Sequence, residues 1–557
     1  MNQPIKIVIV GGVAGGASAA TRARRCNEDA EIILIEKDDF VSFANCGLPY
    51  HIGGEIPDRN RLLVASRELL ERRFRLDVRI REEVRRIDRS SKCVSVYRKA
   101  DDTEYELKYD KLILSPGASP FVPPVPGVDA TGVFTLRNVH DMDRICAAVD
   151  SSADRKAVVV GAGFIGLEMV EQLVGRGFEV SLAELQPQIL PPMDPEMVAP
   201  IEEDLLTRGV TLCRGDGISR IRADEQNQAV GVELSSGRFL EGSLIILGLG
   251  VRPQTKLAVD AGLETGRTGG IATNKFFQTS DPDIYAVGDA CEYVFGPTGE
   301  SMRVSLAGPA NRAGRLAGQH AATGSSDAAS PVFGTAIVRV FEHTAAMTGL
   351  SEKAAQRSGI PAASTVIVAG QHAGYFPGAR PITLKLTFHP ETGKVLGAQA
   401  VGFDGVDKRI DVIATAMAFG ATVRDLAGLD LAYAPPFGSA KDPVHQAAFA
   451  ACNQLDGLTH HLPPGVDLTD VQVVDVRTSA EVTKSPLNCC TVAINIPVDE
   501  LRHRLGELIP GVRTVVSCGV GLRGHVAARI LRQKGFPDTS NLSGGATVRR
   551  RARPDNS

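Results

Sequence analysis

One cysteine, Cys46, has the clearest potential for redox chemistry in this chain. It lies in the stretch Ser42-Phe43-Ala44-Asn45-Cys46-Gly47-Leu48-Pro49-Tyr50, just beyond a candidate nucleotide-binding segment, and that stretch contains no second cysteine. A redox cysteine without such a partner must exchange electrons with a small-molecule thiol or pass through an oxidised form of its own sulfur. A buried structural cysteine is the alternative. The neighbouring nucleotide-binding pattern favours redox chemistry.

A second candidate, Cys518, opens a loop near the C-terminal end of the sequence. A hydrophobic strand pattern over residues 513–517 leads into Cys-Gly-Val-Gly-Leu-Arg-Gly, and an amphipathic helix pattern follows. In a strand-loop-helix arrangement, backbone N–H groups and a helix N-terminus point at the sulfur, and we expect them to stabilise its thiolate. Four residues separate Cys518 from Arg523, which suits a persulfide sulfur, whereas a phosphatase loop of this shape is one residue longer. We therefore favour sulfur transfer over phosphatase chemistry and over a purely binding role.

Residues 5–36 carry the pattern of a dinucleotide-binding unit. A predicted strand at 5–10 is followed by Gly11-Gly12-Val13-Ala14-Gly15-Gly16, a helix pattern, and a strand that ends in Glu36. In such a unit, N–H groups at the helix N-terminus hold a pyrophosphate, while the acid accepts a hydrogen bond from a ribose hydroxyl. Val13 replaces the middle glycine of the usual G-x-G-x-x-G pattern. We therefore expect the pyrophosphate to approach slightly differently.

Residues 156–184 repeat this unit with all three glycines in place. Gly161, Gly163 and Gly166 follow the strand, and the next strand ends in Glu184. A single dinucleotide needs one such fingerprint, so two copies indicate one flavin site and one nicotinamide site. A carboxylate at Glu184 would repel the 2′-phosphate of NADPH, and no arginine follows within the next several residues. Glu184 therefore predicts NADH as the nicotinamide nucleotide.

Length and composition describe an ordinary globular protein of several domains. The 557 residues exceed what one core supports and suggest roughly three or four domains. Hydrophobic residues make up 43%, charged residues 23%, and the net charge is -4, which gives no electrostatic case for binding nucleic acid or an anionic membrane. We find no export signal and no apolar run of about 18–20 residues. The ten cysteines show no C-x-x-C spacing, so we expect a reducing cytoplasm and no bound metal.

Small polar segments divide the second half of the chain. Residues 321–330 predict a linker. Beyond it, an α+β domain is indicated by strand patterns at 335–341, 364–369 and 382–388 and by a helix pattern at 406–419. Residues 458–465 predict a second linker. The α/β unit that follows has buried strand patterns at 473–477 and 513–517.

The whole layout resembles a known superfamily. Residues 279–289, a short strand pattern that runs into Gly288-Asp289, resemble the second flavin motif of the pyridine nucleotide-disulfide oxidoreductases. Residues 42–46 and 11–16, together with Tyr433-Ala434-Pro435-Pro436-Phe437, resemble coenzyme A-disulfide reductases, and the C-terminal unit resembles a rhodanese domain. The fused form is similar to the coenzyme A-disulfide reductase/rhodanese flavoproteins, which include NADH-dependent persulfide reductases. Only the tail after Gly545, with its arginines at 549–551, departs from a rhodanese end.

This resemblance implies an α/β protein with two Rossmann-like nucleotide-binding domains, in which the NAD domain is inserted into the FAD domain. It predicts an FAD-binding domain of residues 1–118 and 252–323, an NAD-binding domain of 119–251, an α+β dimerisation domain of 331–450 and a rhodanese domain of 466–550. It also implies a homodimer that acts on coenzyme A and small persulfides or polysulfides. In the family, the single cysteine forms a mixed disulfide with coenzyme A, which accounts for the missing second cysteine.

The resemblance also assigns residues by position. The expected catalytic residues are Cys46, Cys518 and Arg523, with Tyr375 and Tyr433 reaching the sulfur from the partner subunit to donate a proton. The expected contacts to FAD and NADH are Gly11, Val13, Ala14, Gly15, Gly16, Glu36, Asn45, Pro116, Gly117, Gly161, Gly163, Phe164, Ile165, Gly166, Glu184, Gly250, Gly288, Asp289 and Ala307. The expected contacts to coenzyme A are Ser18, Arg22, Arg25, Ser42, Asn45, Asn311 and Lys441, where Asn311 replaces a histidine of one relative. Alternatively, Arg22 and Arg25 form an exposed helix face, and Tyr375 and Tyr433 are ordinary interface residues.

Together these patterns predict an FAD-dependent NADH:persulfide or polysulfide reductase that releases thiol and sulfide at Cys46, while Cys518 handles sulfane sulfur. A coenzyme A-disulfide reductase is the nearest alternative. An NADH oxidase or peroxidase would use Cys46 as a sulfenic acid, but residues 11–16 lack the histidine that such peroxidases place beside the flavin. A non-catalytic flavoprotein redox sensor is the alternative from another class, and the presence of both cysteines in suitable settings speaks against it.

Overall fold

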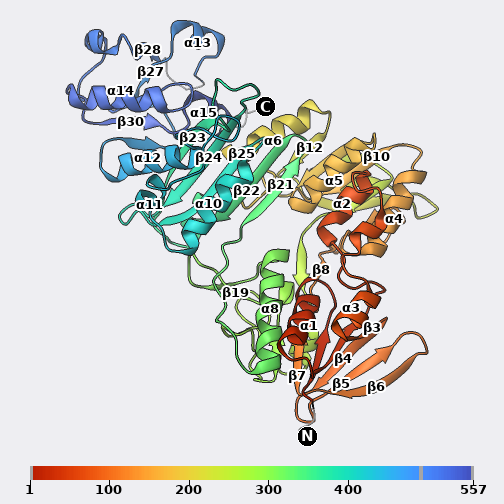
Figure 1. Cartoon of the computed structure of the whole chain (residues 1–557). Coiled ribbons are helices and arrows are strands. Elements are labelled where there is room, and N and C mark those ends of the chain that lie inside the picture. The colour runs from red at the N-terminus through yellow and green to blue at the C-terminus, as the bar shows by residue number, and fades with distance from the viewer. Residues whose placement is uncertain (1–3, 488–492, 553–557) are drawn as a thin grey trace. The chain divides into compact units, whose positions relative to one another are not determined.

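The computed structural model describes residues 4–487 and 493–552 of the 557-residue chain. Its elements form two compact units, one of residues 1–187 and 209–334 and the other of residues 188–208 and 335–557 (Figure 1). The first unit contains two parallel five-stranded sheets, and the second contains one antiparallel and one parallel five-stranded sheet. Within the described residues, no helix combines the length and the apolar character that crossing a membrane requires.

The first sheet has the strand order β18-β7-β1-β2-β3 and is parallel throughout. Its strands are β1 (Lys6–Val10), β2 (Glu31–Glu36), β3 (Asp77–Ile80), β7 (Lys111–Leu114) and β18 (Ile284–Ala286). Strand β1 pairs on both sides and is buried from Ile7 to Val10, which explains its unbroken run of Ile and Val. The strands predicted at 5–10 and 31–36 are confirmed.

Two helices of the first unit touch each other backbone to backbone. Helix α1 (Ala14–Cys26) follows β1, and α8 (Ala307–Thr323) packs against it (Figure 1). A Cβ built on Gly314 of α8 would lie 2.1 Å from the carbonyl oxygen of Gly15. Any side chain at Gly314 would therefore separate the helices. Because α8 runs on to Thr323, the linker predicted at 321–330 is wrong for its first three residues.

The second parallel sheet has the order β12-β11-β10-β16-β9. Its strands are β9 (Val133–Phe134), β10 (Lys156–Val160), β11 (Glu179–Glu184), β12 (Thr211–Arg214) and β16 (Leu244–Leu247). Helix α4 (Val139–Ser151) precedes β10, and α5 (Phe164–Gly175) follows it. An antiparallel pair, β8 (Ala118–Pro120) and β17 (Val251–Pro253), lies where the chain enters and leaves this half. The second sheet is thus inserted in sequence between β7 and β18 of the first.

The remaining elements of the first unit are smaller. Strands β4-β5-β6 and β13-β14-β15 form antiparallel sheets, and β19 pairs with β20. Their bounds, with those of the short helices and 3-10 turns, are β4 (Glu82–Asp88), β5 (Cys93–Arg98), β6 (Thr103–Lys108), β13 (Ile218–Ala223), β14 (Ala229–Leu234), β15 (Phe239–Glu241), β19 (Tyr293–Val294), β20 (Ser301–Met302), α2 (Leu48–Gly53), α3 (Arg67–Phe74), α7 (Lys256–Asp260), η1 (Asn45–Gly47), η2 (Arg59–Leu62) and η3 (Gly288–Ala290).

The second unit contains an antiparallel sheet of order β21-β22-β25-β24-β23. Its strands are β21 (Ala336–Val340), β22 (His343–Gly349), β23 (Ala363–Gly370), β24 (Pro381–Phe388) and β25 (Val395–Gly402). Its helices are α6 (Pro195–Thr207), α9 (Glu352–Arg357), α10 (Val406–Ala418), α11 (Val423–Ala427) and α12 (Pro443–Leu455). The three predicted strands and the predicted helix of this region are confirmed. Strands β22 and β25 were not predicted, because Ala, Gly and Thr dilute the large β-branched residues that indicate a strand.

The C-terminal part of the second unit is a parallel sheet of order β26-β30-β29-β27-β28. Its elements are β26 (His460–Leu462), β27 (Gln472–Asp475), α13 (Ser479–Lys484), β28 (Ile494–Asn495), η4 (Leu501–His503), η5 (Leu505–Glu507), β29 (Thr514–Ser517), α14 (Leu522–Gln533), β30 (Thr539–Leu542) and α15 (Gly545–Ala552). The linker predicted at 458–465 is partly wrong, since β26 is an edge strand of this sheet and is too short to show a strand pattern. The basic tail is also structured, because buried Arg549 donates to the carbonyls of Pro464 and Val466.

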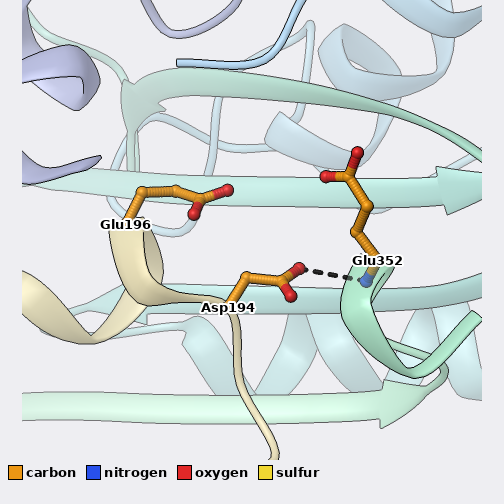
Figure 2. A group of neighbouring side chains, drawn as sticks. All are labelled: Asp194, Glu196 and Glu352. Atoms are coloured by element: carbon orange, nitrogen blue, oxygen red, sulfur yellow. Dashed lines mark hydrogen bonds between the residues drawn. The ribbon is translucent and has the colours of Figure 1, made fainter. Parts of the chain in front are cut away.

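A buried lysine joins α6 to the antiparallel sheet of the second unit. Asp194, Glu196 and Glu352 bring three carboxylates together, a grouping that could hold a metal ion (Figure 2). The ammonium of Lys385 lies among them, at 2.9, 2.6 and 2.7 Å from their oxygens. Burial alone would raise the pKa of Asp194, but the charge of Lys385 brings it below its ordinary value. The cluster is therefore a salt-bridge network around a buried cation.

Replacing this lysine tests the network. Lys385→Met leaves buried carboxylates without a counter-charge, so we expect the second unit to lose about 3–5 kcal/mol of unfolding free energy at pH 7. The depressed pKa of Asp194 means that the wild-type stabilisation is present above about pH 4 and is lost as the pH falls. The difference between variant and wild type should therefore shrink on acidification. Urea unfolding at pH 7 and at a pH below about 4 measures this difference in unfolding free energy. Lys256→Met, which removes an exposed pair with Asp260, is the matched control. Equal effects of the two substitutions would contradict the prediction.

Candidate functional site

The two parallel sheets of the first unit carry glycine turns of the same construction. Gly11 and Gly161 have φ angles of +94° and +101°, in the left-handed region that favours glycine. A Cβ on Gly16 would lie 1.8 Å from the carbonyl oxygen of Gly11, and one on Gly166 would lie 1.9 Å from that of Gly161. These glycines allow α1 and α5 to begin directly after their strands, with the helix N-termini above the strand ends.

Buried acids hold both turns in place. Glu36 accepts a hydrogen bond from the Gly12 N–H at 2.7 Å, and Glu184 accepts one from the Ala162 N–H at 2.7 Å. The two side chains are among the buried charged groups of the protein. Burial raises the pKa of Glu36, and its backbone hydrogen bonds oppose that shift. Each carboxylate is therefore fixed beside its glycine turn, where the ribose of a bound dinucleotide would meet it.

The N-termini of α1 and α5 fit dinucleotide phosphates. Among the described residues, neither helix has a side-chain cap hydrogen bond or an acid in its first turn, so the first N–H groups favour an anion. A Cβ on Gly163 would meet nothing within 4 Å, which leaves room for a phosphate. Val13 occupies the equivalent position of α1 with a φ of -94°, which needs no glycine. The valine side chain therefore adds bulk where Gly163 leaves open space.

A third element completes the edge of the first sheet. Strand β18 runs into η3, where Gly288 has a φ of +81° and Asp289 follows it. Arg137 donates to Asp289 at 3.1 Å. The same guanidinium would lie 3.1 Å from a Cβ on Gly117, whose φ is +71°. Arg137, which was not predicted from the sequence, therefore lies beside three expected cofactor contacts. These are Gly117, Gly288 and Asp289.

The other expected cofactor contacts lie close to these elements. Pro116 comes directly before Gly117, and the carbonyl of Gly250 accepts a hydrogen bond from the Phe121 N–H. Ala307 begins α8, which packs against η3. The structure therefore gathers the two glycine turns and the third motif in one unit of the chain.

Cys46 lies between the two nucleotide-binding halves of this unit. It is exposed in η1, where Asn45 Oδ1 accepts the Cys46 N–H at 3.1 Å and lies 3.7 Å from its Sγ. The next helix, α2, packs against α4 and α5. Although the residue as a whole is exposed, the protein around the thiol displaces water and raises its pKa, and the carboxylates of Glu168 and Asp289 raise it further while Arg137 opposes them. Charged groups from both halves therefore converge on one thiol.

Several residues expected to contact coenzyme A lie together on α1 and α8. Ser18 donates to Asn311 Oδ1 at 2.5 Å, and Arg22 donates to Gln319 Oε1. The side chain of Asn311 on α8 thus accepts a hydrogen bond from α1. This pairing supplies one polar surface from two helices that are far apart in the sequence.

The other residues expected at the coenzyme A site lie on several different elements of the chain. Arg25 is exposed, with its guanidinium 5.9 Å from the centroid of the Phe74 ring. Ser42 has a φ of +48°, and its N–H donates to the carbonyl of Gly12, which connects the Cys46 stretch to the first glycine turn. Lys441 belongs to the second unit. The alternative interpretation, in which the arginines only form an exposed helix face, thus fits Arg25 better than Arg22.

The two expected tyrosines form a pair in the second unit. The hydroxyls of Tyr375 and Tyr433 are 2.9 Å apart, and both rings are exposed. The hydrogen bond between the two hydroxyls raises the pKa of Tyr375 above its ordinary value. A cavity of about 870 Å³ beside them is lined by Tyr433, Lys408 and Phe437, among other residues. An exposed phenol pair next to a cavity can donate a proton to a bound molecule.

Cys518 lies at the end of β29, where the loop meets α14. Its Sγ accepts a hydrogen bond from the Gly521 N–H at 3.1 Å, and the residue is 1% exposed. Helix α15 supports the loop from the other side, since the Ala546 N–H donates to the Cys518 carbonyl at 2.7 Å. The expected strand-loop-helix arrangement, with a backbone donor at the sulfur, is present.

Two arginines whose charges act on Cys518 are both paired with carboxylates. Arg523 makes two hydrogen bonds to Glu481, at 2.6 and 2.8 Å. Arg477 lies 2.5 Å from Asp475, and both of these side chains are buried. Arg523 was expected from the sequence, whereas its partner Glu481 was not. The signal that could have found Glu481 is the capping box Thr478-Ser479-Ala480-Glu481 at the start of α13.

Two family models match the chain. Residues 5–314 match the family described as pyridine nucleotide-disulphide oxidoreductase, and residues 335–443 match its dimerisation domain. A coenzyme A disulfide reductase of Staphylococcus aureus is 34% identical over 446 residues, which cover 80% of this chain and 99% of that protein.

Two solved structures are similar over almost the whole chain. The structure of reduced Bacillus anthracis CoADR-RHD has 44% identity and a TM-score of 0.93, with 99% of this chain and 98% of that chain covered. The NAD-dependent persulfide reductase from A. fulgidus has 35% identity and a TM-score of 0.91, with coverages of 98% and 100%. This likeness includes the C-terminal parallel sheet, which lies beyond both family matches.

The environment of Cys46 predicts the direction in which its pKa is shifted. Because its pKa is raised, alkylation of Cys46 by iodoacetamide in nucleotide-free protein should keep accelerating above about pH 8.5, the ordinary thiol value. Glu168→Gln should move the midpoint down, whereas Arg137→Gln should move it up, because the two groups act with opposite sign. Mass spectrometry of the Cys46 peptide measures the rates. Shifts in the same direction for both variants would show that these charges do not control the thiol.

Proposed function

Because this chain belongs to the pyridine nucleotide-disulphide oxidoreductase family, we propose that it is an FAD-dependent enzyme that uses NADH to reduce coenzyme A persulfide and related persulfides or polysulfides at Cys46. The observation that carries this proposal is the convergence of groups from both nucleotide-binding halves on one exposed cysteine. A single cysteine suits a reaction in which the second sulfur belongs to the substrate. The near-complete likeness to a persulfide reductase supports the same substrate class.

The proposed chemistry at Cys46 has two steps. The Cys46 thiolate attacks the inner sulfur of R–S–S–H, so that hydrosulfide leaves and a mixed disulfide R–S–S–Cys46 forms. Two electrons and one proton then break this disulfide and give R–SH and the Cys46 thiolate. Bound FAD supplies the two-electron relay from NADH. The carboxamide of Asn45, whose oxygen lies 3.7 Å from the sulfur, holds the cysteine in position.

We assign two roles to the second unit: it would donate a proton to the reacting sulfur, and it would join two chains in a homodimer. We assign the exposed Tyr375–Tyr433 pair to protonate the departing R–S⁻ from the other subunit of a homodimer, and the matched dimerisation domain supports this assembly. The polar surface of Ser18, Arg22 and Asn311 is proposed to hold coenzyme A. The C-terminal sheet with Cys518 is assigned as a rhodanese domain that takes sulfane sulfur from bulkier donors.

Reduction of coenzyme A disulfide is the second candidate, favoured by the coenzyme A disulfide reductase relative. The same attack by Cys46 would then release coenzyme A thiolate in place of hydrosulfide. Anaerobic kcat/KM values for coenzyme A persulfide and coenzyme A disulfide decide between the two.

Substituting each cysteine separates the proposed roles. Cys46→Ser should keep FAD and its reduction by NADH but lose reduction of every persulfide or disulfide. Cys518→Ser should lose sulfur uptake from protein-bound or polymeric donors, yet reduce small coenzyme A persulfides within about tenfold of wild type, or about 1.4 kcal/mol of barrier. Steady-state NADH oxidation with both kinds of donor measures this. A Cys518 variant as inactive as the Cys46 variant on the small substrate would mean that the two sites act in obligatory series.

Glu184 makes a prediction about the nicotinamide nucleotide. Its carboxylate is held by backbone N–H groups beside the second glycine turn and would repel a 2′-phosphate. We expect kcat/KM to favour NADH over NADPH by about tenfold or more, and Glu184→Gln to narrow that ratio. Equal kcat/KM values for NADH and NADPH in the wild type would show that Glu184 does not select the nucleotide.

A further inference from the structure

Within the described part of the chain, the two arginines whose charges act on Cys518, Arg477 and Arg523, are both paired with carboxylates. We propose that this site takes sulfane sulfur from an organic persulfide, R–S–S⁻, with an apolar carbon group, and that Glu481 makes it discriminate against thiosulfate. The inference rests on the sulfur-transfer role proposed for Cys518 and adds its substrate class.

Glu481 removes the charge of Arg523 from the loop. A Cβ on Gly519 would lie 3.6 Å from Arg523 Nη2, so the guanidinium stands directly against the residue after Cys518. Both oxygens of Glu481 accept hydrogen bonds from that guanidinium. The carboxylate is also fixed by the Thr478 N–H at 3.0 Å, as part of the capping box of α13. The pairing is therefore built into the helix start.

Arg477 is unavailable to a donor for a different reason. Its Nε and Nη2 donate to Asp475, and its Nη1 donates to the Ser485 carbonyl at 2.8 Å. Its side chain is 5% exposed and that of Asp475 is 0% exposed. Both arginines that act on Cys518 are thus neutralised, one at the surface and one in the interior.

The rim of the loop is apolar and open. Val520, Leu522 and Val526 are 40%, 71% and 40% exposed, and the last two are one helical turn apart. A carbon group beside the reacting sulfur would gain by covering these side chains. A sulfonate group would instead meet apolar surface and a carboxylate, which disfavours it.

The transfer step itself balances without an oxidant. The Cys518 thiolate attacks the terminal sulfur of R–S–S⁻, the donor S–S bond breaks, and R–S⁻ leaves while Cys518–S–S⁻ forms. With thiosulfate the same attack would release sulfite, which places two negative charges on the leaving group. Arginines already paired with carboxylates stabilise such a leaving group less than unpaired cations would.

The test uses the full-length FAD-containing enzyme with Cys46→Ser, so that sulfur loaded on Cys518 is not reduced. Propyl persulfide and thiosulfate are the two probes, and addition of one sulfur atom to the Cys518 peptide is followed by mass spectrometry. We expect propyl persulfide to load at least about tenfold faster than thiosulfate. Glu481→Gln should raise the thiosulfate rate about tenfold at low salt, with a gain that fades as salt screens Arg523, whereas Glu481→Asp should restore discrimination.

A second variant keeps the proposal testable if Glu481→Gln fails to fold. Leu522→Gln should slow loading from propyl persulfide and leave the thiosulfate rate unchanged. The specificity inference is overturned if thiosulfate loads the wild-type loop as fast as propyl persulfide, or if Glu481→Gln leaves the ratio of rates unchanged. Failure of both probes to load any variant would instead overturn the sulfur-transfer role of Cys518.

Discussion

Contact between backbones at a few glycines sets the geometry of both nucleotide-binding halves. Gly16 and Gly166 press their helices onto the turns that end β1 and β10, closer than any side chain would allow. Gly314 then lets α8 rest on α1, and α8 packs against η3 and Asp289. A Cβ at one of these positions would displace the helices whose N-terminal N–H groups would hold the phosphates of bound nucleotides. The site therefore depends on the absence of side chains as much as on their presence.

This dependence explains how much could be predicted. Glycine spacing followed by an acid is a local signal, so the glycine turns, Glu36 and Glu184 could be found in the sequence, as could most of the strands. Arg137 and Glu168 carry no such signal, because each meets Cys46 only through folding of a distant segment. Glu481 has a local signal in its capping box, but that signal indicates a helix start and not the pairing with the distant Arg523. The edge strand β26 was missed because three residues are too few to show a strand pattern. The helical tail α15 was missed because its partner, the Cys518 loop, is another segment of the chain.

The two cysteines are prepared for different chemistry. Cys46 is exposed, yet the protein around its thiol displaces water and raises its pKa, and the carboxylates of Glu168 and Asp289 raise that pKa further. Cys518 is buried, and its sulfur already accepts a backbone N–H. These settings suit the two proposed roles, in which Cys46 receives electrons and Cys518 holds a sulfane sulfur.

The same kind of ion pair has different consequences at different depths. Lys385 is buried among carboxylates, so removing it strands charges in the interior and the network is a matter of stability. Arg523 and Glu481 are about two-fifths exposed, at 37% and 43%, where such a pair contributes at most about 1 kcal/mol. Stability alone is therefore a weak reason for two charges to be held so firmly beside Cys518. The proposed effect on substrate choice is the stronger reason. The carboxylate of Glu481 is fixed by a helix cap, so it offsets the charge of Arg523 whenever a sulfur donor approaches Cys518.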